Sequence, residues 1–139
     1  MKLKYPGGVW PVMLTPFTRA GEVDTEGLTA LVDWYIDMGA KGLFAACQSS
    51  EIYYLTPEER RLITRTTVKA VPVIASGHTS DTVSGSVREL SAMAEEGADA
   101  VIVISNHFCR SGEGDEIWLE NCEKVLSQLD PAIDMGIYE

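Results

Sequence analysis

The polar residues that follow an apolar run ending at Ala46 have side chains suited to binding a small acid. Gln48, Ser49 and Ser50 place one amide and two hydroxyls next to one another. Together with free backbone N–H groups, such side chains can hold a small carboxylate. The alternative is a serine-rich turn that caps its own backbone. These three residues are therefore candidates for substrate binding.

Further candidates follow or end other apolar runs. Tyr138 stands in the last run, and a phenol can both donate and accept a proton, unless it is only a core aromatic at a strand end. His107 could titrate near neutrality, or serve as a structural or solvent-facing side chain. Thr15 and Phe108 complete a possible pocket.

Composition argues against several other classes of site and partner. The three cysteines contain no C-x-x-C pair and the two histidines stand far apart, so neither a disulfide framework nor a metal site is expected. A net charge of −10 disfavours nucleic acids and anionic membranes. No apolar run approaches the roughly 20 residues that span a bilayer. We expect a cytoplasmic protein without a signal peptide.

Apolar runs alternate with amphipathic stretches along the whole chain. The predicted strands cover residues 9–14, 43–46, 73–75, 100–104 and 135–138. The predicted helices cover about 25–38, 57–70, 83–94 and 118–129. Thr56, Pro57 and Glu59 form the strongest start signal, because they fit the N-cap, N1 and N3 positions of a helix. Asp24 or Thr25 can cap the first helix.

This alternation predicts an α/β fold with a parallel sheet. The strands are continuously apolar and each is separated from the next by one helix, which implies cover on both faces. A Gly-Ala turn before residue 43 recurs before residue 101, two units of about 30 residues later. We therefore expect residues 1–139 to form the N-terminal half of a (β/α)8 TIM barrel, about four and a half units, truncated in strand five. A doubly wound sheet is the alternative, although no G-x-G-x-x-G follows the first strand.

Several motifs resemble those of the dihydrodipicolinate synthase and N-acetylneuraminate lyase superfamily of class I aldolases. They are Thr15-Pro16-Phe17, Ser49-Ser50-Glu51 followed by Leu55-Thr56-Pro57-Glu58-Glu59-Arg60, Gly97-Ala98-Asp99-Ala100, and Tyr138. The resemblance implies homotetrameric barrels without a cofactor. It also implies a lysine that forms a Schiff base with pyruvate, or a similar small 2-oxo acid, and a loop that holds the carboxylate.

The roles that the resemblance implies differ in how well this sequence keeps them. Tyr138 matches the proton-shuttling tyrosine, and Ser49 keeps the hydroxyl of the second threonine in the carboxylate loop. Gln48 stands at the first threonine, a relay hydroxyl in the synthase branch. Phe108 stands at the tyrosine that completes that relay from a neighbouring subunit. The expected activity is therefore a lyase reaction other than that of the synthase itself.

The lysines of the chain do not fit the Schiff-base role. Lys2 and Lys4 precede the first strand, Lys41 precedes the second, and Lys69 and Lys124 fall on helices. The family places this lysine on strand six, roughly 30 residues further on. Three hypotheses follow: a piece of a full aldolase, a half-barrel module that binds a 2-oxo acid without catalysis, or a complete small α/β domain of another function.

Overall fold

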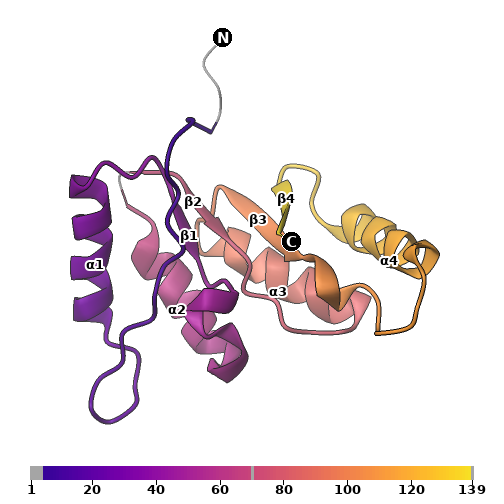
Figure 1. Cartoon of the computed structure of the whole chain (residues 1–139), viewed down its shortest axis with the longest axis horizontal. Helices are drawn as coiled ribbons and strands as arrows, with labels where there is room; N and C mark the ends of the chain where they lie inside the picture. Colours follow the sequence, from indigo (N-terminus) through magenta and orange to yellow (C-terminus); the bar gives the residue numbers. More distant parts are fainter. Residues whose placement is uncertain (1–4, 70, 139) are drawn as a thin grey trace.

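Four parallel strands form the centre of the molecule in a computed structural model, which describes residues 5–69 and 71–138 (Figure 1). The strands are β1 (Leu43–Ala45), β2 (Val73–Ala75), β3 (Ala100–Ile104) and β4 (Asp134–Tyr138), in the order β1-β2-β3-β4. The helices are α1 (Thr25–Asp37), α2 (Pro57–Thr67), α3 (Val83–Glu95) and α4 (Asp115–Gln128). Three 3-10 turns are η1 (Gln48–Ser50), η2 (Ile52–Tyr54) and η3 (Ser105–His107).

The first two helices begin where their capping residues predict, whereas α4 begins at Asp115, three residues before its predicted start, without a side-chain cap. Asp24 caps α1, and its Oδ1 accepts a hydrogen bond of 2.9 Å from the N–H of Gly27. Thr56 and Glu59 form a reciprocal capping box at the start of α2, with Pro57 as the first helical residue. The helix ends at Thr67, whereas its expected end near Ala70 lies outside the described residues. The sequence signals for these helix starts are thus confirmed.

The first predicted strand, residues 9–14, is wrong as a strand. This segment forms only an isolated parallel bridge between Val12 and Phe44. The N–H of Phe44 donates to the carbonyl of Pro11 at 3.0 Å, and the N–H of Met13 donates to the carbonyl of Phe44 at 2.8 Å. Pro11 has no N–H of its own, so a regular ladder cannot extend through it. The segment nevertheless runs beside β1, where a first strand would lie.

The two faces of the sheet have very different cover. Leu43, Val73 and Val101 point outward into the main core, which α1 to α4 close. Figure 1 shows these helices following one another around one side of the sheet. The inner face carries a small cluster of Phe44, Cys47 and Ile102, with Val12, Ile74 and Tyr138 partly buried against it. The sequence expectation of a parallel sheet with a helix between successive strands is confirmed, whereas among the described residues the helices cover one face of the sheet rather than both.

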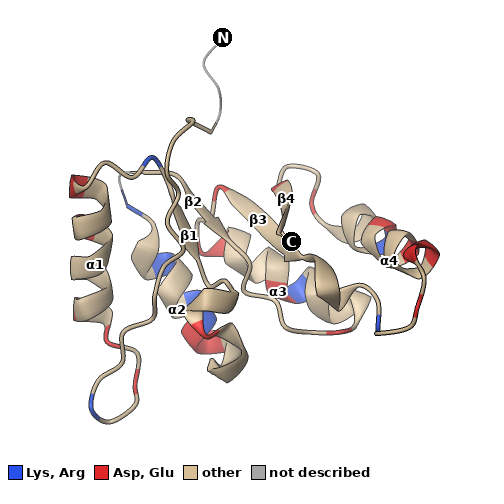
Figure 2. Ribbon diagram, in the orientation of Figure 1, with Lys and Arg blue, Asp and Glu red and all other residues tan. Residues whose placement is uncertain are grey.

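Charged residues lie on the helices and loops and at Asp134 of β4, whereas β1, β2 and β3 carry none (Figure 2). Within residues 5–69 and 71–138, no helix is long and apolar enough to cross a membrane. In parallel barrels the reactive residues lie in the loops that follow the strands.

Candidate active site

The loop after β1 is held in shape by Ser50. Its hydroxyl donates to the carbonyl of Met13 at 2.6 Å and accepts from the N–H of Cys47 at 3.1 Å. Thr15, also buried, donates from Oγ1 to the carbonyl of Ser50 at 2.7 Å. Ser50 therefore caps the backbone of its own turn, which is the alternative to substrate binding considered for this loop. Thr15 ties that turn to the segment before β1.

Two residues of this loop have a backbone that is rare outside glycine. Ala46 and Glu51 stand on either side of Cys47–Ser50 with φ values of 46° and 63°, in the left-handed region. Between them, the side chain of Ser49 is exposed and that of Gln48 is half-buried. The loop thus presents Ser49 outward on a backbone that internal hydrogen bonds hold in place.

Tyr138 lies at the C-terminal end of β4, and the loop follows the C-terminal end of β1, so both are at the same end of the parallel strands. Its ring packs edge to face against Phe44, with centroids 5.7 Å apart, in the inner cluster that also contains Cys47. Burial raises the pKa of the Cys47 thiol, an effect that hydrogen bonds from the N–H groups of Gln48 and Ser49 oppose. Cys47 is therefore a packed thiol rather than a nucleophile.

The loop between β2 and α3 is anchored by a buried arginine of α2. Arg60 donates from Nη1 to the carbonyl of Gly77 and to Oγ1 of Thr79, both at 2.9 Å. It also pairs with Glu89 at 3.5 Å, and Glu89 in turn accepts from the N–H groups of Thr79 and Ser80. This charged pair fixes the loop that carries His78 and Asp81.

His78 is a fully buried, neutral histidine. Its Nε2 accepts a hydrogen bond of 2.7 Å from the N–H of Ile104 at the end of β3, so its proton resides on Nδ1. Burial above all, then the charges of His107 and Arg60, lowers its pKa to about 3. Nδ1 has no hydrogen-bond partner among the described residues. His78 thus fastens the β2–α3 loop to β3 without carrying charge near neutral pH.

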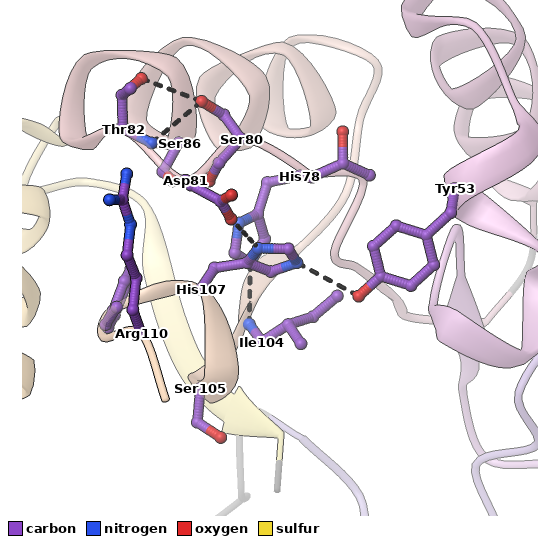
Figure 3. A network of polar contacts seen from close by, with 12 residues as sticks. Tyr53, His78, Ser80, Asp81, Thr82, Ser86, Ile104, Ser105, His107 and Arg110 are labelled. Atoms are coloured by element: carbon purple, nitrogen blue, oxygen red, sulfur yellow. Dashed lines mark hydrogen bonds and ion pairs between the residues drawn. The ribbon is translucent and has the colours of Figure 1, made fainter. Parts of the chain in front are cut away.

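His107 joins three loops in one polar network (Figure 3). Its Nδ1 lies 2.9 Å from Oδ1 of Asp81, and its Nε2 lies 3.2 Å from the hydroxyl of Tyr53. The same hydroxyl accepts from Nε2 of Gln48 at 3.1 Å. The ring of His78 packs edge to face against that of His107, with centroids 5.2 Å apart. A carboxylate, an imidazole, a phenol and an amide are therefore linked in one chain of hydrogen bonds.

Phe108, the neighbour of His107, points into the main core on the outer face of the sheet, called the outer core below. It is 3% exposed and packs against Trp118 of α4, with ring centroids 5.8 Å apart. His107 and Phe108 both line a cavity of about 460 Å³ that reaches from Asp81 to Asn121. Among residues 5–69 and 71–138, no three side chains of His, Cys, Asp or Glu gather as a metal site would require.

Tyr53, Asp81 and His78 belong to the site but were not among the residues predicted from the sequence. Asp81 and His78 lie in the β2–α3 loop, and Tyr53 lies in η2, eight residues beyond β1 in the chain. The available signal was that loops after neighbouring parallel strands meet at one edge. That rule brings His107 near the β2–α3 loop, but the partner of each side chain requires coordinates.

Comparisons with known proteins agree with the resemblance seen in the sequence. Residues 5–115 match the family described as the dihydrodipicolinate synthetase family. A 4-hydroxy-tetrahydrodipicolinate synthase of a Jannaschia species is 36% identical over 105 residues, which is 73% of this chain and 36% of the relative. A synthase of Rhizobium meliloti is 35% identical over 106 residues, 73% of this chain and 35% of the relative.

Solved structures give the same result for the fold. A crystal structure of a dihydrodipicolinate synthase superposes with a TM-score of 0.83 at 26% identity, covering 95% of this chain and 45% of that one. The prophage protein YagE of Escherichia coli, solved in complex with pyruvate, gives 0.82 at 25% identity, covering 95% and 44%. The chain spans about a third of its curated relatives and under half of these structures. The prediction of an N-terminal half of a TIM barrel is confirmed.

Proposed function

The chain belongs to the dihydrodipicolinate synthetase family, and we propose that it supplies the 2-oxo-acid half of an aldolase site. The main support is the geometry of the loop after β1. Ser50 and Thr15 hold this loop in shape, and Ser49 is exposed on it. A preset loop of this kind suits a small carboxylate, because binding then requires little ordering of the backbone. YagE, a structural neighbour, was solved with pyruvate.

In this proposal Ser49 and Gln48 bind the carboxylate of a pyruvate-like acid, and Tyr138 donates and accepts protons at the carbinolamine that precedes the Schiff base. The packing of Tyr138 in the cluster that contains Cys47 supports a position beside the loop. The full reaction makes or breaks a carbon–carbon bond through a lysine Schiff base. Residues 1–139 then form the N-terminal part of a barrel in a cytoplasmic homo-oligomer, and the lysine lies on the next strand.

Two residues direct the proposal away from the synthase reaction itself. Gln48 offers an amide where the family relay has a hydroxyl, and an amide does not pass a proton as a hydroxyl does. Phe108 has no hydroxyl and is packed against Trp118. We therefore propose a lyase of the family with a different aldehyde partner.

Titration of the isotope-labelled chain with pyruvate, followed by NMR, tests the carboxylate loop. We expect the amide signal of Ser49 to shift, and Ser49→Ala to weaken binding roughly fivefold, the effect of about one lost hydrogen bond. Ser84→Ala, at an exposed position of α3, is the matched control and should bind as the parent does. Unchanged Ser49 signals at saturating pyruvate would contradict the proposal.

Borohydride reduction in the presence of pyruvate tests the location of the lysine. Lys69 pairs with Asp33 and Lys124 with Glu120, both away from the loop after β1. We expect no reduced adduct on the 139-residue chain, and one adduct on a form that also carries the next strand with its lysine. A pyruvate adduct on any lysine of the present chain, seen by intact mass, would refute this part.

A further inference from the structure

The hydroxyl of Tyr53 lies beside Gln48, where this chain lacks the hydroxyl of the family relay. It lies 3.1 Å from the amide of Gln48, the residue at the place of the first relay hydroxyl in the family. Phe108 provides no hydroxyl there, because its side chain is a hydrocarbon buried in the outer core. Tyr53, with 51% of its surface exposed, is therefore the phenol that the described part of this chain offers beside Gln48.

The partners of Tyr53 are ordered as an acid–base chain. The carboxylate of Asp81 can only accept, so Nδ1–H of His107 donates to it. The lone pair of Nε2 is then directed at the hydroxyl of Tyr53. The hydroxyl can donate to that lone pair while its own oxygen accepts from Gln48. The His107 side chain is only 8% exposed, so water competes little for Nε2.

We propose that Tyr53, His107 and Asp81 form an acid–base triad, with the Tyr53 hydroxyl as its reactive group on the aldehyde side of the site. The proposal rests on the aldolase function given above. Tyr53 replaces, within one chain, the hydroxyl that Gln48 and Phe108 lack. The neutral His78 packed against His107 adds no positive charge beside the triad.

The proton transfers balance in both directions. During cleavage, the substrate hydroxyl gives its proton to the Tyr53 oxygen as Tyr53 gives its own proton to Nε2 of His107. The electron pair of the breaking carbon–carbon bond moves to the 2-oxo acid held as a Schiff base, and the released half becomes an aldehyde. The resulting imidazolium is paired with Asp81. Condensation runs through the same steps in reverse.

Acetylation by N-acetylimidazole measures whether the hydroxyl of Tyr53 is activated, and it needs no aldolase activity. Tyr54 is the internal control, because it neighbours Tyr53 and is 87% exposed. We expect Tyr53 to be acetylated faster than Tyr54 despite its lower exposure. His107→Gln should slow Tyr53 roughly tenfold by removing the base, and Asp81→Asn should slow it less. The rate of Tyr54 should not change in either variant, and far-UV circular dichroism checks separately that each variant keeps the fold.

The outcomes separate this inference from the aldolase proposal. If Tyr53 reacts more slowly than Tyr54 and His107→Gln leaves its rate unchanged, the triad is wrong. If pyruvate shifts the Ser49 signal but Tyr53 is acetylated no faster than Tyr54, the 2-oxo-acid proposal stands and the triad fails. If pyruvate leaves Ser49 unchanged while His107→Gln still slows Tyr53, the activated hydroxyl stands and the aldolase proposal fails.

Discussion

The outer and inner faces of the sheet are built from alternate residues of the same strands, yet they serve different purposes. The outward residues join a core that four helices close, and Leu43, Val73 and Val101 are fully buried there. The inward residues form a small cluster in which Ile74 and Tyr138 are only partly buried. Stability is therefore concentrated on the outer face, and the inner face near the strand ends is left to the site.

Polar contacts to well-packed elements fix the loops that follow the short strands. The loop after β1 is fixed by the hydroxyls of Ser50 and Thr15, while the β2–α3 loop is fixed by Arg60 and Glu89. These polar contacts tie the loops to elements that the outer core stabilises. The geometry of the candidate site thus depends on packing that lies on the opposite side of the sheet.

Truncation of one residue on each face gives the largest expected contrast. Leu43→Ala removes a fully buried side chain from the outer core and should lower the free energy of unfolding by about 2–5 kcal/mol. Ile74→Ala, on the inner face of the neighbouring strand, should cost about 1 kcal/mol, because that side chain is partly exposed. Urea denaturation of both variants measures the difference. Equal losses would contradict the assignment of stability to the outer face.

Removal of the Ser50 hydroxyl tests whether the loop after β1 depends on it. Ser50→Ala leaves the buried N–H of Cys47 and the carbonyl of Met13 without this partner, at a cost of about 1–3 kcal/mol. Ser49→Ala, at the exposed neighbouring position, should change stability by less than about 0.5 kcal/mol. Thermal and urea unfolding measure both. A stable Ser50→Ala variant would show that the loop is held by other contacts.

The buried His78 predicts a dependence of stability on pH. The unfolded chain binds a proton at this histidine below about pH 6.5, whereas the folded chain, with a pKa of about 3, does not. Between these values His78 should lower the free energy of unfolding by about 1.4 kcal/mol for each unit of falling pH. His78→Gln retains an acceptor for the N–H of Ile104 and should flatten this slope. Parallel slopes in parent and variant, from denaturation between pH 7 and pH 4, would disprove it.

Much of the outer face could be predicted from the sequence, and little of the polar network. Helix starts were predictable because Asp24 and Thr56 act on neighbouring residues in the chain. The strand expected at residues 9–14 was wrong because apolar character outweighed the missing N–H of Pro11. Tyr53 and Asp81 meet at His107 from two different loops, and no local pattern records such a meeting.

The left-handed backbone at Ala46 and Glu51 has a consequence for the kinetics of ligand capture. Both residues are held in this uncommon conformation by the hydrogen bonds that Ser50 and Thr15 make within and across the loop. The unfavourable torsions are therefore adopted during folding, and an incoming acid meets a receptor whose shape is already complete. Association should then be limited by diffusion into the site rather than by rearrangement of the loop, so the observed rate should rise linearly with ligand concentration.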